Sequence, residues 1–173
     1  MRTGAPVADV RHSIRRADGS VVRLSINASP MFDDAGRLSA VVCSIEDITS
    51  RAKADQRCDF MAAVVDSSPE AVVGLTLAGA IVSWNRAAAT LYGYDAAVAT
   101  GHNVAMLVPE AFREQLADAL ARIGRGETVE PFTAERIRRD GSRFAARLAL
   151  TPVLSASGDI AGATVTVREI GPA

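Results

Sequence analysis

The sequence is poor in the residues on which metal sites and disulfide frameworks depend. Its 173 residues include two cysteines and two histidines, with no CxxC spacing and no nearby histidine pair. We therefore expect neither a zinc site nor a disulfide framework. Paired carboxylates and nucleophile–base motifs are not apparent either, and we expect a protein that is not an enzyme.

An excess of charge of one sign is also lacking. The 19 basic and 20 acidic residues give a net charge of −1, which argues against a nucleic-acid partner, because such binding needs a concentrated basic face. Arginines gather at 15–16 and at 136, 138 and 139 beside predicted hairpin turns, and we interpret both clusters as solvated turn tips. Lys53 is the one lysine, which together with abundant alanine is typical of a GC-rich bacterial genome.

Long hydrophobic runs are missing. The longest uncharged stretch, residues 71–85, is shorter than the roughly 20 apolar residues that cross a bilayer. The N-terminus has no apolar segment of the kind found in secretory signals. The sequence therefore predicts a cytoplasmic protein without a membrane partner. Its 49% of hydrophobic residues suffice for one core and part of a second.

The chain contains two near-copies of one pattern, residues 14–48 and 136–170, which align without a gap at an offset of 122 residues. An offset of this size fits one small domain and is too long for a solenoid repeat. We therefore predict the tail of one domain followed by a whole copy of the same domain. The matching positions are Gly4 and Gly126, Asp18-Gly19-Ser20 and Asp140-Gly141-Ser142, Pro30 and Pro152, Gly36 and Gly158, and Ile48 and Ile170.

Both copies show the two-residue alternation of half-buried strands, joined by turns with a strong Asp-Gly hairpin signal. The phase is the same in each copy, and a slip of one residue would turn each apolar set toward water. We predict three strands in residues 1–48 and interpret Cys43 as an inert core thiol. The inward sets are Val22, Leu24, Ile26, Ala28, Val41, Cys43 and Ile45, and then Phe144, Ala146, Leu148, Leu150, Ala163, Val165 and Val167.

Residues 49–66 contain helix formers and no Gly or Pro, and predict a helix that ends before Pro69. Four residues spaced by 4, 3 and 4 form an apolar seam: Ala54, Cys58, Met61 and Val65. Two heptads are too few to establish a coiled coil. A dimer seam and a helix resting on its own domain both remain open.

Residues 67–124 predict a hairpin at 71–84, short helices at 86–91 and 95–99, and a longer helix at 109–123. Pro109 suits a first helical position. An apolar stripe of Phe112, Leu116, Leu120 and Ile123 marks the buried face of the long helix. With the strands that follow, the element order is ββ, helices, βββ.

This order, with the runs SPEAVVGLTLAGAIVSWNRAAATLYGY, GHNVAMLVPEAFRE and RRDGSRFAARLALTPV, resembles the PAS family of sensors (PAS/PAC, S-box type) over residues 67–170. Residues 1–48 resemble the C-terminal half of another PAS domain. The resemblance implies an α+β fold with a five-stranded antiparallel sheet, order 2-1-5-4-3, and helices on one face, with Pro131 at the start of an edge strand. We divide the chain into a half domain at 1–48, a signalling linker helix at 49–66 and a complete domain at 67–173.

The resemblance also implies a function. PAS domains sense small molecules, light or redox state, dimerise, and signal along helices, and Asp47-Ile48-Thr49 resembles the triplet that joins many of them to a linker helix. We expect a non-catalytic sensory homodimer with a separate or missing effector domain. Two alternatives remain: a ligand-free dimerisation module, and the sensor fragment of a histidine kinase, diguanylate cyclase or phosphatase.

Two family cofactors are disfavoured residue by residue. Flavin photosensors use a cysteine in G-x-N-C, and the corresponding run here ends in Val104, so a thiol adduct is excluded there, while non-covalent flavin stays open. Haem sensors place a histidine on the long helix, and the matching residue is Leu116, which has no donor atom. Candidate pocket walls, each also readable as packing, are Trp84, Asn85, Met106, Leu116, Leu120 and Leu148.

The half domain poses a physical problem. Without two further strands and helices, the strand at 38–48 has an open edge and its apolar face has no cover, which makes a lone meander marginal and adhesive. We expect either that a partner covers it or that the chain is a piece of a longer protein.

Overall fold

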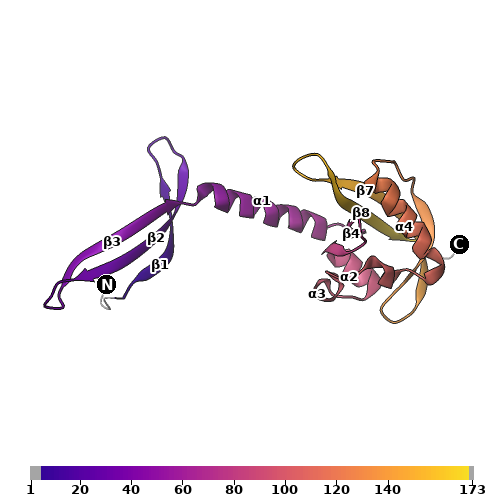
Figure 1. The fold of residues 1–173 in the computed structure, drawn as a ribbon, viewed down its shortest axis with the longest axis horizontal. Coiled ribbons are helices and arrows are strands. Elements are labelled where there is room, and N and C mark those ends of the chain that lie inside the picture. The colour runs from indigo at the N-terminus through magenta and orange to yellow at the C-terminus, as the bar shows by residue number, and fades with distance from the viewer. Residues whose placement is uncertain (1–4, 172–173) are drawn as a thin grey trace. The chain divides into compact units, whose positions relative to one another are not determined.

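The computed structural model describes residues 5–171, which form two compact units. Unit 1 extends to Met61 and unit 2 starts at Ala62, so the division falls inside one helix, α1 (Thr49–Asp66). Figure 1 follows the chain from the strands of unit 1 through α1 to the strands and helices of unit 2. The predicted helix at 49–66 is thus present with the same bounds.

Unit 1 is an antiparallel meander of three strands, β1 (Val7–Arg15), β2 (Val21–Phe32) and β3 (Leu38–Asp47), in the order β1-β2-β3. The Asp-Gly signal forms the first turn: Gly19 takes a φ of 83°, and Asp18 Oδ1 accepts the backbone N–H of Ser20 at 2.8 Å. A left-handed φ of this kind favours glycine.

Unit 2 contains a five-stranded antiparallel sheet in the order β5-β4-β8-β7-β6, which confirms the predicted 2-1-5-4-3 order and the α+β fold. β6 is an edge strand, and Pro131 immediately precedes it. The elements are β4 (Ala71–Thr76), β5 (Ile81–Trp84), α2 (Arg86–Tyr92), α3 (Ala96–Ala99), the 3-10 helix η1 (Val104–Leu107), α4 (Glu110–Gly124), β6 (Phe132–Ile137), β7 (Arg143–Leu154) and β8 (Ile160–Glu169).

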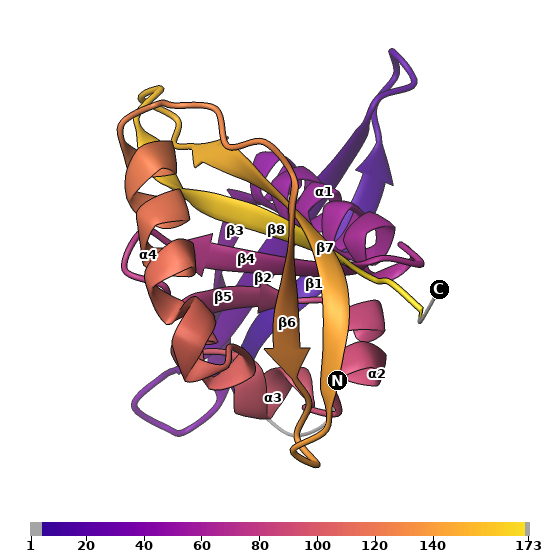
Figure 2. The same cartoon turned by 90° about the vertical axis from the view of Figure 1, so that its right-hand side faces the viewer.

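The core of unit 2 lies between this sheet and its helices. α4 packs against β7 and β8, and Figure 2 shows it beside the curved sheet. Its buried residues are Leu116, Ala119, Leu120 and Ile123, which include three of the four residues of the predicted stripe. The fourth, Phe112, is half-buried against the core. The inward residues of β7, Phe144, Ala146, Leu148 and Leu150, are all buried, and they alternate with exposed residues and the half-buried Ala149.

The near-copies seen in the sequence share one strand register. Ile26 pairs with Ile45 in unit 1, and 122 residues later Leu148 pairs with Val167 in unit 2. The same offset relates the bounds of β2 to those of β7 and of β3 to those of β8. Even the register shift near the end of β2, between Met31 and Phe32, recurs in β7. The match of Gly4 lies outside the described residues.

The structure corrects three expectations. Arg136 is 3% exposed and so is not part of a solvated turn tip, because it follows Ala134 by two residues on the inward face of β6. Cys43 is exposed, because no helix within the described residues packs extensively against β3. Pro109 is the N-cap of α4, and the helix begins at Glu110.

No helix within residues 5–171 combines the length and apolarity needed to cross a bilayer.

Candidate functional site

Asn85 joins three segments of unit 2 at the point where α1 ends. Its side chain is 2% exposed and caps α2, since Oδ1 accepts the N–H of Ala88 at 2.9 Å. The same oxygen accepts the N–H of Val72 in β4 at 3.0 Å. Nδ2 donates to the carbonyls of Val65 in α1 at 3.1 Å and of Glu70 at 3.0 Å. All four hydrogen-bonding positions of the amide are therefore used.

A carboxylate adds a second tie at this junction. Asp66, the last residue of α1, accepts the backbone N–H of Arg86 through Oδ1 at 3.0 Å. Arg86 is the first residue of α2, where backbone N–H groups lack partners inside the helix. The end of α1 is thus fixed to the start of α2 from both sides.

Three aromatic rings fill the interior next to α2. The Tyr92 ring lies 5.4 Å from Trp84 and 5.5 Å from Phe144, both in tilted arrangements. Trp84 is buried and donates its indole N–H to the Tyr94 carbonyl at 3.0 Å. Burial raises the pKa of Tyr92 to about 12, although nearby Arg136 acts in the opposite direction. Aromatic packing of this kind contributes beyond the area it buries.

Arg136 is a buried cation at the inner end of β6. Its Nη1 donates to the carbonyl of Glu135 at 2.8 Å, and the phenol of Tyr92 lies beside it. Burial lowers the pKa of the guanidinium, because removal from water disfavours its charged form.

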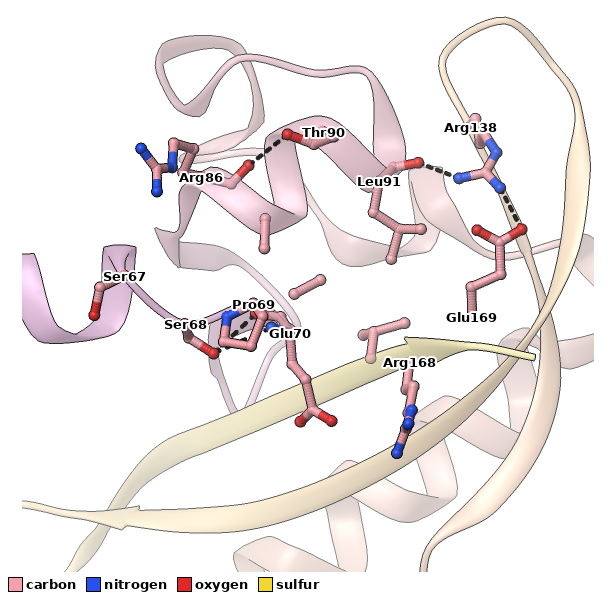
Figure 3. Close-up of a pocket in the computed structure, with 13 residues that line it drawn as sticks. Ser67, Ser68, Pro69, Glu70, Arg86, Thr90, Leu91, Arg138, Arg168 and Glu169 are labelled. Atoms are coloured by element: carbon pink, nitrogen blue, oxygen red, sulfur yellow. Dashed lines mark hydrogen bonds and ion pairs between the residues drawn. The ribbon is translucent and has the colours of Figure 1, made fainter. Parts of the chain in front are cut away.

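Arg138 connects three elements at the rim of a surface groove. Nη1 donates to the carbonyl of Leu91 in α2, and Nη2 pairs with Glu169 Oε1 at 2.7 Å, as Figure 3 shows. The guanidinium carbon also lies 4.1 Å from the centroid of the Phe144 ring. The groove has a volume of about 870 Å³ and lies between the chain entry at Ser67–Ala71, α2 and the end of β8.

Unit 1 repeats this ion pair at the start of α1. Arg16 and Asp47, each 122 residues before its counterpart, lie 3.9 Å apart. Asp47 Oδ1 accepts the N–H of Thr49 at 2.9 Å, and Thr49 Oγ1 accepts the N–H of Arg23 at 2.9 Å. Hydrogen bonds from Thr49, with the charge of Arg16, hold the pKa of Asp47 below its usual range.

The six predicted pocket walls divide among different places. Leu116 and Leu120 come together in a surface cleft of about 270 Å³, together with Val104 and Arg113. Asn85 is part of the polar junction described above. The other three lie in or against the hydrophobic core: Trp84 and Leu148 buried, and Met106 half-buried.

The two positions tested for cofactor chemistry are occupied by packed aliphatic side chains. Val104 and Leu116 are both buried. His102 is exposed, and its carbonyl accepts the N–H of Ile81 at 2.9 Å. In the described part of the chain, His, Cys, Asp and Glu form no group of three or more arranged to hold a metal ion.

Comparison with known proteins identifies the fold. The family described as "PAS fold" matches residues 59–170, and a second one, described as "PAS domain", matches residues 1–50. The chain belongs to the PAS family. The PAS domain of a protein from Colwellia psychrerythraea is 25% identical, with a TM-score of 0.55, and the match covers 68% of this chain and 97% of that one.

Two further matches are to a two-component sensor histidine kinase and to a two-component system protein. A PAS domain from a two-component sensor histidine kinase is 18% identical, with a TM-score of 0.58, over 68% of this chain and 99% of that one. Two-component system protein A of Emericella nidulans is 28% identical over 144 residues, which is 78% of this chain and 20% of that protein. The chain therefore spans about a fifth of that relative's length.

The PAS resemblance predicted the sheet but not the polar ties. The ion pair of Arg138 and Glu169 was not predicted. The repeat could have indicated it, because an arginine and a carboxylate stand at the equivalent positions of both copies, Arg16 and Asp47 in the first. The burial of Arg136 was also detectable, because it shares the strand phase of Ala134. Asn85 was predicted as a candidate pocket wall, whereas its role as a cap follows from its place directly before α2.

Proposed function

We propose that this chain is the sensory module of a two-component type signalling protein. In it, unit 2 senses and α1 passes the change along the chain. The observation that carries the proposal is Asn85. One side chain holds the end of α1, strand β4 and the start of α2, so a shift of α2 alters the hydrogen bond to the Val65 carbonyl in α1. The likeness to a PAS domain from a two-component sensor histidine kinase and to a two-component system protein supports this assignment.

Arg138, at the rim of the groove, connects the end of β8 to α2, the helix that Asn85 caps. Arg138 holds the last turn of α2 through Leu91 and the end of β8 through Glu169. A ligand or partner that moves α2 would therefore bias both the entry and the exit of unit 2. Such a bias requires a binding free energy that differs between the two arrangements.

We also propose that the module works as a homodimer through α1. None of the residues of α1 is buried, and a broad apolar stripe along it is exposed: Phe60, Met61, Val64 and Val65. Cys58 and Ala54 extend the stripe toward the start of the helix. A helix of this length gains little stability alone, and packing of its apolar face against a second helix supplies it.

Sedimentation of matched variants tests the dimer. Met61→Asp adds one negative charge inside the stripe. Asp59→Asn also changes the charge by one unit, but it lies about 160° around the helix from Met61 and outside the stripe. We expect Met61→Asp to weaken self-association by at least about tenfold, the effect of roughly 1.4 kcal/mol, and Asp59→Asn to leave it unchanged. An unchanged profile for Met61→Asp would remove α1 as the interface.

A ligand-free interaction module is the second candidate, and the filled interior favours it. Trp84, Tyr92 and Phe144 pack at aromatic contact distances where a cavity would be needed. Mass spectrometry of material released on denaturation, with an absorption spectrum of the folded protein, separates the two candidates. A bound small molecule supports sensing, flavin or haem bands identify a light, redox or gas sensor, and a protein that releases nothing supports the interaction module.

A further inference from the structure

The inward side of β3 in unit 1 and its outer edge form a surface that we call the open face, defined by Val41, Cys43 and Ile45. Within the described residues β3 pairs with β2 alone. All three side chains are exposed, and Ile45 reaches 63%. An apolar strand with unpaired backbone groups is a template for another strand.

Unit 2 shows what the same surface looks like when covered. The residues 122 positions later, Ala163, Val165 and Val167, are all buried, the last at 3% exposure. β4 pairs with the outer edge of β8 there, and α4 packs against β8. The registers of the two meanders agree residue by residue, so the surfaces are equivalent in geometry and differ in cover.

We propose that the open face binds a polypeptide segment of the pattern seen in residues 67–126, a β-hairpin followed by short helices. Its first strand runs antiparallel to β3, as β4 does to β8. The strand satisfies the backbone groups of the edge, and the helices bury the apolar side chains of the face. A second copy of β3 would satisfy the edge but would bring no helix to cover the face.

Ala40 limits how far the bound strand can pair along β3. Gly162 pairs with Thr76 in β4, and a Cβ atom there would lie 2.1 Å from the carbonyl oxygen of Leu75. The equivalent residue of β3 is Ala40, which has that Cβ atom. The bound strand therefore pairs with β3 from Val41 onward and turns away before Ala40.

A fusion tests the proposal on the full chain. Residues 67–126 of this sequence replace residues 1–4, so that the inserted Gly126 takes the position of Gly4 and the spacing of unit 2 is reproduced. Ala40→Gly removes the predicted clash. Cys43 reports cover through its rate of modification by a thiol reagent. All chains in the comparison carry Cys58→Ser, which removes the second thiol, and the same chain unfolded in denaturant gives the reference rate.

In the parent chain we expect Cys43 to react at a rate comparable with that in the unfolded chain. In the Ala40→Gly fusion we expect Cys43 to react at least about tenfold more slowly than in the parent, since reaction then requires local opening. The same fusion with Ile45→Asp should restore the reactivity, and the fusion that keeps Ala40 should lie between. Hydrogen exchange of the β3 amides gives an independent measure of the paired edge.

Two results would overturn the proposal. One is an Ala40→Gly fusion in which both Cys43 and the β3 amides stay as reactive as in the parent. The other is a parent chain in which Cys43 is already protected and becomes reactive with Ile45→Asp as self-association is lost. That result would assign the open face to a second copy of this chain.

Discussion

Arg138 Nη2 lies 2.7 Å from Glu169 Oε1, and through this contact the turn after β6 is tied to the last residue of β8. The same guanidinium donates to the Leu91 carbonyl and lies over the Phe144 ring. One side chain thus joins a helix end, a strand end and the aromatic cluster.

Replacing Arg138 should destabilise unit 2. Arg138→Ala removes an ion pair, a hydrogen bond to a backbone carbonyl and a cation–π contact, which together are worth about 1–3 kcal/mol. Arg143→Ala is the control, because its ion pair with Glu135 is longer, 3.5 Å, and mostly exposed, so that about 0–0.5 kcal/mol is expected. Urea unfolding measures both, and equal losses would contradict the assigned role of Arg138.

The glycine at 162 should be irreplaceable on steric grounds. Gly162→Ala places a Cβ atom 2.1 Å from the Leu75 carbonyl oxygen, so β4 must separate from β8. We expect a loss of at least about 2 kcal/mol in the free energy of unfolding. Gly171→Ala has no heavy atom within 4 Å of its new Cβ and should be neutral. A stable Gly162→Ala protein with unchanged exchange in β4 would contradict this packing.

Tyr92 should make unit 2 sensitive to alkali. Its pKa is raised by burial from 10.0 to about 12, so between these values the unfolded chain loses the phenol proton before the folded one does. The free energy of unfolding therefore falls as the pH rises from about 10 toward 12, by up to about 1.4 kcal/mol per pH unit from this group. Tyr92→Phe should remove that part of the slope and Tyr94→Phe should not; identical slopes in all three proteins would show that Tyr92 does not contribute.

The sheet and its register could be predicted from the sequence, but the hydrogen bonds and ion pairs of Asn85 and Arg138 could not. Strand alternation is a period-two signal written in each strand, and the repeat supplied an internal check on its phase, so β2, β3, β7 and β8 could be placed. Apart from the local cap at Ala88, Asn85 and Arg138 bind partners 13 to 47 residues away, and these are mostly backbone carbonyls and N–H groups. Backbone groups are the same at every position, so no residue pattern marks which of them a side chain will reach.

Cys43 shows a prediction of burial that was wrong. Cys43 stands in an apolar strand phase and was interpreted as a core thiol, since a phase predicts which way a side chain points. Burial also requires a second layer, and unit 1 has none over this face among the described residues. The alternation in residues 1–48 therefore predicts the direction of each side chain but not whether another layer buries it.

Polar ties at the end of α1 should also control the stability of the whole unit. Asn85→Ala removes a helix cap and leaves the Val72 N–H and the Glu70 carbonyl without their partner, which should cost about 2–4 kcal/mol. Asn85→Asp keeps the acceptor for Ala88 but sets a carboxylate against two carbonyls, and should lose more than the cap alone. Asn103→Ala, which removes the exposed cap of η1, should cost about 1 kcal/mol or less. Thermal unfolding ranks the three variants, and a cost for Asn85→Ala no greater than that for Asn103→Ala would contradict this role.

Hydrogen exchange along α1 in the Asn85→Ala variant tests the central claim, that Asn85 couples unit 2 to this helix. The amides of residues 62–66 should exchange faster than in the unsubstituted chain, while those of the β6–β7 hairpin, residues 133–147, stay unchanged as the internal reference. Asn103→Ala should leave both segments unaltered. Unchanged exchange at 62–66 in Asn85→Ala, with the hairpin intact, would show that α1 is independent of unit 2 and would contradict the proposed relay.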